Sequence, residues 1–251
     1  MNSKIIIITL LVLFATIDSK AQFTSQGKIE FERKSNIHRQ LEDMSSDNEG
    51  GGGWFEKMKS QIPKFNVSYF DFFFNTSASY YYPGREVENP FKMFGAAPGA
   101  ANEIYTDFNK KRVTGFKQVF EQKYLVQDSM RVLEWKIEDE VRTIANFKCR
   151  KAVAKICDSV YVVAFYTEDI LVSGGPEMFS GLPGMILEIA IPRLYTTWVA
   201  TKVEIYTPKT EELKIPEKGK KVNQQELYTD LMGSIGKWGK WAHRSVWWSV
   251  I

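Results

Sequence analysis

Histidines are the first candidates for chemistry, and the chain has only two, His38 and His243. Neither has a Cys, His, Asp or Glu at a spacing that forms a recognisable metal site. Ser180 lies in MFSGL, which lacks the first glycine of the G-x-S-x-G pattern of serine hydrolases. The Gly-rich stretch 174–184 contains no G-x-x-x-x-G-K-[ST] phosphate loop. The sequence therefore predicts no catalytic residue, no metal site and no cofactor.

The two cysteines, Cys149 and Cys157, are the remaining candidates for reactive side chains. Residues 147–156 have the pattern of a strand, and 157–159 that of the turn after it. Eight residues of extended chain span about 26 Å, whereas a disulfide needs Cα atoms within about 7 Å. We therefore expect two free thiols, with no base that would activate either as a nucleophile.

The most distinctive stretch is a hexapeptide, GLPGMI, that predicts a turn feeding a buried strand. Pro183 presets φ for the second turn position, and Gly184 can supply the positive φ that a type II turn needs next. Residues 185–189 then form a mostly apolar strand. The motif is therefore interpreted as a structural turn made by Gly181, Leu182, Pro183, Gly184, Met185 and Ile186.

A second feature is a cluster of tryptophans near the end of the sequence. Four of the seven lie here, interleaved with Lys237, Lys240 and Arg244: Trp238, Trp241, Trp247 and Trp248. Trp beside Lys or Arg suits a protein-partner hot spot or a membrane surface. The alternative is that the segment covers an open sheet face. We expect sheet cover for part of it and partner contact at its end.

The first 21 residues have the pattern of a secretory signal peptide. Lys4 gives the positive end, 5–17 is apolar, and 19–21 is a small-x-small cleavage site. The apolar run is shorter than the roughly 20 residues of a membrane-spanning helix. No Cys stands at the cleavage point, so we expect an exported periplasmic or outer-membrane-associated protein that is not a lipoprotein. The net charge of +3 does not indicate a nucleic-acid binder.

The remainder is predicted to be mainly β. An aromatic hairpin over 65–82 and short alternating segments from 103 to 207 predict an antiparallel meander. One of these segments, 133–137, alternates like a half-buried strand. We therefore expect a sheet curled into a sandwich or half-open barrel, with a short C-terminal helix.

The predicted organisation is a signal peptide (1–21), a β domain and a tail. The β domain covers 22–207, with flexible loops at about 42–63 and 83–102. Its first strand starts near Lys28 and runs towards Leu41. The tail, 208–251, consists of a charged linker, a helix over 223–232 that Asn223 could cap, and the tryptophans.

The order of these features resembles the GLPGLI family of exported Bacteroidetes proteins. The motif differs from GLPGLI only by Met185 in place of Leu. Six other segments follow the family's order: 79–80, 124–129, 133–137, 144–152, 161–170 and 174–176. The glycines 50–53 and the tryptophan-rich tail depart from it. The resemblance implies no established activity. It implies export and an association with outer-membrane nutrient transporters.

Two triplets, 128–130 (DSM) and 158–160 (DSV), match a short pattern used for O-glycosylation in exported Bacteroidetes proteins. Ser129 and Ser159 would carry the glycan, and both lie at predicted turns. Asp-Ser pairs are also common turn formers, so the pattern has a structural reading as well.

These features favour a non-catalytic envelope protein that is an accessory or binding subunit of an outer-membrane transporter or other envelope complex. Its partner could be a TonB-dependent transporter, and the tail could touch the membrane peripherally. One alternative is a periplasmic carrier that holds an apolar ligand in the curled sheet. The third is a hydrolase with an unrecognised site.

Overall fold

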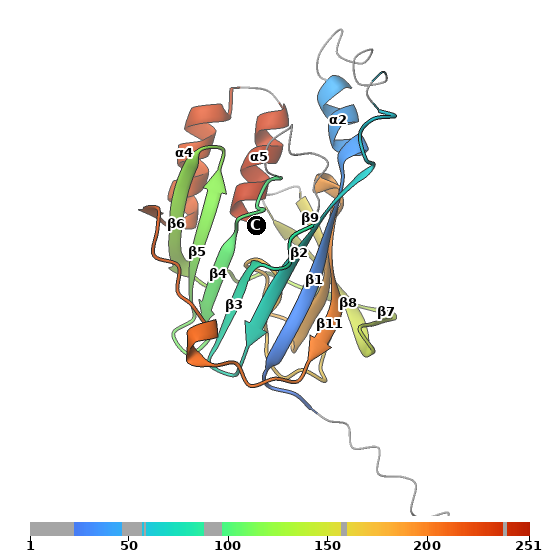
Figure 1. Ribbon diagram of the computed structural model, residues 1–251, viewed down its shortest axis with the longest axis vertical. Helices are drawn as coiled ribbons and strands as arrows, with labels where there is room; N and C mark the ends of the chain where they lie inside the picture. The colour runs from blue at the N-terminus through green and yellow to red at the C-terminus, as the bar shows by residue number, and fades with distance from the viewer. Residues whose placement is uncertain (1–22, 47–56, 58, 88–96, 157–159, 238–239) are drawn as a thin grey trace, which may run out of the picture.

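The computed structural model describes residues 23–46, 57, 59–87, 97–156, 160–237 and 240–251 (Figure 1). The predicted signal peptide lies outside these ranges. The described strands are β1 Gly27–Asn36, β2 Phe65–Phe74, β3 Ala78–Pro83, β4 Glu103–Asp107, β5 Arg112–Val119, β6 Gln122–Ser129, β7 Lys136–Ile144, β8 Phe147–Ile156, β9 Val160–Thr167, β10 Met185–Ile191, β11 Thr196–Glu204 and β12 Lys220–Val222. The helices are α2 Ile37–Ser46, α4 Gln224–Ile235 and α5 Lys240–Val250, with 3₁₀ turns η3 Pro192–Leu194 and η4 Thr210–Glu212.

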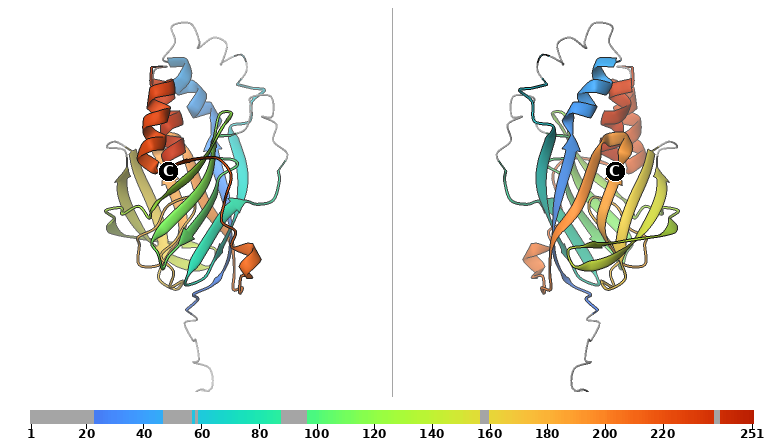
Figure 2. Two further views of the ribbon diagram at one scale, coloured as in Figure 1. Left: turned by 90° about the vertical axis from the view of Figure 1, so that its left-hand side faces the viewer. Right: turned by 90° about the vertical axis from the view of Figure 1, so that its right-hand side faces the viewer.

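These strands form one curled sheet that does not close, in the order β12-β6-β5-β4-β3-β2-β1-β11-β10-β9-β8-β7 (Figures 1 and 2). The mainly β fold and its curled shape are confirmed. The prediction of a purely antiparallel sheet is wrong at one edge, because β12 pairs with β6 in parallel. β1 lies near the middle and joins the meanders β2–β6 and β7–β11.

Short turn signals determine most hairpins as predicted. The Asn75 side chain accepts hydrogen bonds from the backbone N–H groups of Ser77 and Ala78, both at 2.8 Å, and so closes the β2–β3 turn. Asp107 accepts from the N–H of Lys110 at 2.8 Å in the β4–β5 turn. The pairs β8–β9 and β10–β11 also form as expected.

Two strand predictions are wrong. Residues 130–135 cross from the β6 edge to the β7 edge, so Leu133 and Trp135 lie in a connection and β7 begins only at Lys136. They still pack against the core, since burial there does not require strand geometry. β1 stops at Asn36, whose side chain accepts from the N–H of Arg39 at 3.1 Å and starts α2. The run towards Leu41 is therefore helical.

The segment after Thr207 belongs to the same core. β12 extends the sheet, and Asn223 caps α4 with a reciprocal capping box to Glu226, which confirms the predicted helix. Buried side chains of α4 and α5 join the hydrophobic core of the strands. Both helices lie at the end of the sheet where α2 also lies (Figures 1 and 2). No helix in the described ranges is long and apolar enough to cross a membrane.

Candidate functional site

Two basic side chains lie inside the curled sheet. In β1, the buried positions alternate through Ile29 and Phe31 to Arg33, which is 2% exposed. In β5, they alternate through Val113 to Lys117, which is 1% exposed. Strand periodicity thus places both cations on the inner face, where apolar side chains are expected. Buried charges need partners, so their surroundings define a candidate site.

Glu177 is the buried carboxylate of this cluster and is 3% exposed. Its Oε2 accepts a hydrogen bond from Asn102 Nδ2 at 2.8 Å, and Oε1 accepts one from the Tyr81 hydroxyl at 3.4 Å. The Trp198 indole N–H donates to the same hydroxyl at 3.2 Å. Glu177 has φ of +55°, an uncommon conformation for a side-chain-bearing residue. The backbone of segment 173–184 thus turns its carboxylate into the interior.

Burial dominates the electrostatics of the cluster. It raises the pKa of Glu177, while the charges of Lys117 and Arg33 act in the opposite direction. Burial also lowers the pKa of Lys117 to about 8, and the Glu177 carboxylate opposes this shift. The pKa of Arg33 is lowered by burial too, against the influence of Tyr81 and Glu177. Removing one partner of such a buried group of charges destabilises the fold by more than the complete group stabilises it, because a buried charge is left uncompensated.

A cavity of about 770 Å³ adjoins the cluster. It is lined by residues 97–102, residues 117–122, and Ser245, Trp248 and Ser249 of α5. A volume of this size is typical of small-molecule sites. Lys117, Asn102 and Ser249 form its buried polar part, whereas the β5–β6 turn and Gln118 are exposed to solvent. The cavity therefore combines an enclosed polar end with an open rim.

Arg33 holds one wall of the cavity in place. Its guanidinium donates to the carbonyl oxygen of Pro98 at 2.9 Å. The next residue, Gly99, has φ of +64°, and an added Cβ would lie only 3.0 Å from the Asn102 amide nitrogen. A larger residue would thus be strained in both conformation and space. The wall 97–102 is fixed by the buried cluster at both ends, through Pro98 and Asn102.

Trp248 connects α5 to this cluster. Its ring lies 5.7 Å from that of Trp198, and the Arg33 guanidinium lies 5.4 Å from its centroid. Trp248 is buried, so it covers the inner sheet face and leaves no open surface for a partner in this structure. Trp247 is half-buried against the core, with Arg193 over its ring at 5.3 Å. Trp238 and the side chain of Trp241 lie outside the described residues.

The hexapeptide motif covers the end of the connection between β9 and β10, where Gly181 and Pro183 are exposed, and the first two residues of β10. The positive φ predicted for Gly184 is confirmed at +144°, and an added Cβ would overlap the Thr167 carbonyl oxygen. The hydrogen bond that closes the turn runs from Gly184 N–H to Leu182 O at 2.8 Å, a tighter closure than a type II turn. Met185 and Ile186 are fully buried. The motif shapes the segment that carries Glu177.

The remaining predicted residues do not meet at this site. Ser129 is exposed at the end of β6, where it pairs with Arg112, rather than in a turn; Ser159 lies outside the described residues. Cys149 is free and buried, and burial raises its pKa to about 12. Cys157 is not described. Among the described residues, no group of three or more His, Cys, Asp or Glu could hold a metal ion.

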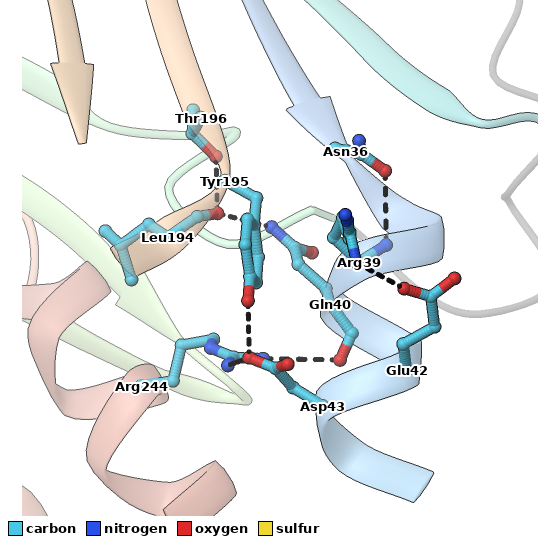
Figure 3. A network of polar contacts seen from close by, with 9 residues as sticks. All are labelled: Asn36, Arg39, Gln40, Glu42, Asp43, Leu194, Tyr195, Thr196 and Arg244. Atoms are coloured by element: carbon cyan, nitrogen blue, oxygen red, sulfur yellow. Dashed lines mark hydrogen bonds and ion pairs between the residues drawn. The ribbon is translucent and has the colours of Figure 1, made fainter. Parts of the chain in front are cut away.

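A second polar network ties α2 to α5 beside the η3 turn (Figure 3). Arg244 pairs with Asp43 and donates to the carbonyl oxygen of Gln40 at 3.2 Å. The Tyr195 hydroxyl donates to the same carboxylate at 2.9 Å, and Gln40 Nε2 donates to Leu194 O at 2.9 Å. This network fixes the two helices at one end of the sheet.

Comparisons with known proteins support the fold and leave the activity open. A family model described as a protein of unknown function (Porph_ging), which is Bacteroidetes-associated, matches residues 154–188. These residues include β9 and the segment 173–184, which ends in the first residues of the hexapeptide motif. No curated protein matches the chain.

Solved structures of PNGF-II in space groups C2 and P21 are similar to this chain, each with a TM-score of 0.52 and 16% identity. The matches cover 84% of this chain but 33% and 34% of those structures, so the chain spans about a third of their length. An uncharacterized conserved protein from Thermus thermophilus matches with a TM-score of 0.39 and 7% identity, over 86% of this chain and 99% of that one. At such identities the likeness to PNGF-II shows the fold alone.

Sequence reasoning missed the whole cluster. The sequence did contain a signal for two residues of the cluster. Arg33 falls on the same alternating positions as Ile29 and Phe31, and Lys117 on the same alternating positions as Val113, so each is expected to face the same side of its strand as these apolar residues. A charged residue at a position where the alternation of the strand predicts a buried apolar side chain has two explanations. Either the inward and outward positions of the strand were assigned the wrong way round, or the charge is buried. Glu177 and Asn102 lie in connections without periodicity, so no comparable signal marks them in the sequence.

Proposed function

We propose that this chain is a non-catalytic binding protein that holds a small amphiphilic molecule in the cavity beside Lys117. The single observation that carries the proposal is the 770 Å³ cavity, whose walls are fixed by the buried cluster. Small-molecule sites combine a mostly apolar lining with a few placed polar groups. Here Val119, Phe120 and Trp248 are apolar; Lys117, Asn102 and Ser249 supply polar groups at the buried end, and the other polar side chains lie nearer the rim.

A non-catalytic role is favoured by the state of the candidate reactive groups. Glu177 is engaged by Asn102 and Tyr81 and is not part of the cavity lining. The Cys149 thiol is buried, and its pKa of about 12 keeps it protonated at neutral pH. Neither group is placed to act as a base or nucleophile on a molecule in the cavity.

We place this binding function in the cell envelope. The predicted signal peptide and the short match to a Bacteroidetes-associated family support export and the GLPGLI resemblance. In this setting the protein could work alone as a carrier or as an accessory subunit of an outer-membrane transporter. Affinity isolation of the tagged protein from its native envelope separates these roles. Recovery of the free monomer alone would contradict the accessory role.

Native mass spectrometry tests the binding function. The protein, purified from its own envelope without detergent, should carry a bound small molecule. Ala101→Phe fills the cavity and should abolish the bound mass. Ala190→Phe, on the half-buried outer side of β10, is the matched control and should retain it. An unliganded wild-type protein, or equal occupancy in both variants, would contradict the proposal.

A further inference from the structure

The enclosed end of the cavity is rich in unused hydrogen-bond donors. Within the described residues, the Lys117 ammonium makes one hydrogen bond, to the main-chain oxygen of Ile251. An ammonium has three N–H groups, so two can still donate to a ligand. The Asn102 amide uses one of its N–H groups on Glu177. Both side chains line the cavity and are almost fully buried.

The charged groups around this end favour an anion. The charges that act on Lys117 are first the Glu177 carboxylate, which Asn102 and Tyr81 also hold, and then Arg131; the Ile251 main-chain oxygen accepts from its ammonium. Glu121, the carboxylate in the cavity lining, lies at the exposed rim. The cavity surface nearest Lys117 thus presents cationic and amide donors, and an anionic oxygen would form charge-assisted hydrogen bonds with them.

The rim has the opposite character. Phe120 lines the cavity at the β5–β6 turn and is 52% exposed. Its φ is +53°, a conformation that is rare for a bulky side chain. The two-residue β5–β6 hairpin turn, in which Val119 pairs with Gln122, requires a positive φ at its first central residue. With Val119 and Trp248, Phe120 gives an apolar path from the enclosed end to solvent.

We propose that the ligand is an amphiphile with a carboxylate head group, which binds Lys117 and Asn102 while its alkyl chain runs towards Phe120. This inference rests on the proposed binding function and adds the class and orientation of the ligand. A carboxylate can accept from both donors at once, and the chain replaces water along the apolar wall.

Isothermal titration calorimetry with three ten-carbon amphiphiles tests the head group. Decanoate, decanol and decyltrimethylammonium share the alkyl chain and are used below their micelle-forming concentrations. Decanoate should bind at least about tenfold more tightly than the other two, as expected for a charge-assisted hydrogen bond. Equal affinities would overturn the head-group assignment and leave the binding function standing. No binding by any of the three would overturn both.

Two variants separate the head from the chain. Lys117→Met should remove the preference for decanoate, whereas Lys155→Met, at an exposed position of β8, should keep it. Phe120→Ala should weaken decanoate and decanol by the same factor, because it alters only the chain contact. A decanoate preference that survives Lys117→Met would overturn the proposal. If that variant fails to fold, the wild-type comparison of the three ligands still decides it.

Discussion

The Asn102 amide donates to the Glu177 carboxylate at 2.8 Å, and both side chains are buried. This contact joins two segments that are 75 residues apart, the cavity wall 97–102 and the motif segment 173–184. The segment 173–184 carries Glu177 and ends in the first residues of the hexapeptide motif. The positive φ of Glu177 and the tight closure at Gly184 shape this segment, and its carboxylate faces the cations of β1 and β5. The segment that best distinguishes the sequence thus supports the candidate site.

Glu177→Gln should destabilise the protein strongly. It removes the carboxylate that faces Arg33 and Lys117, and uncompensated buried charge costs about 3–5 kcal/mol. The matched control is Glu140→Gln, which breaks exposed pairs with Arg142 (3.0 Å) and Lys151 (2.8 Å) and should cost no more than about 1 kcal/mol. Urea denaturation of both variants gives the comparison. Similar losses in the two would show that the buried cluster carries no special role.

Gly184→Ala should destabilise the protein because its Cβ would overlap the Thr167 carbonyl oxygen at a backbone φ of +144°. We expect a loss larger than the ~1 kcal/mol typical of a single substitution. Gly233→Ala is the control: Gly233 lies in α4 with nothing within 4 Å of the added Cβ. It should stabilise by up to about 1 kcal/mol through helix propensity. Thermal melts of the pair should shift in opposite directions.

The pH dependence of stability should reveal Lys117. Its pKa is about 8 in the folded protein and near 10.4 when unfolded, so between these values the unfolded state binds more protons. The free energy of unfolding should therefore rise with pH through this window, by about 3 kcal/mol from this group. Lys117→Met removes the contribution. The difference in the free energy of unfolding between wild type and variant should change between about pH 8 and 10.4. A difference that stays constant over this range would contradict the burial of a charged Lys117.

Trp248→Ala tests whether the end of the chain covers the sheet. Removing a buried tryptophan that packs on Trp198 should cost about 3–5 kcal/mol. Tyr161→Ala, an exposed aromatic on β9, should change stability by less than about 0.5 kcal/mol. Guanidinium denaturation measures both. If the Trp248 variant is as stable as wild type, Trp248 does not cover the sheet, and the alternative prediction of a partner contact applies to it.

Local sequence signals predicted much of the fold. The hairpin over 65–82, the helix start at Asn223 and the positive φ of Gly184 were all predicted correctly. Alternation failed at 133–137, because a connection that packs Leu133 and Trp135 on the core shows the same period as a strand. Pairing between distant strands, such as β1 with β11, leaves no local signal.

The candidate site was harder to predict for the same reason. Its parts come from β1, β5, two connections and α5, and only the folded sheet brings them together. For Arg33 and Lys117 the sequence contains a weak indication, because each alternates in step with the buried apolar residues of its strand. Asn102 and Glu177 became recognisable only through their contact in three dimensions.

The most direct test of the account is the crystal structure of the protein with 10-bromodecanoate. Anomalous scattering from bromine locates the end of the alkyl chain without reference to any prior assignment. We predict bromine on the Phe120 side of the cavity and the carboxylate within hydrogen-bond distance of Lys117 Nζ and Asn102 Nδ2. Bromine bound elsewhere, or an empty cavity at a saturating ligand concentration, would contradict the central claim that this cavity is the binding site.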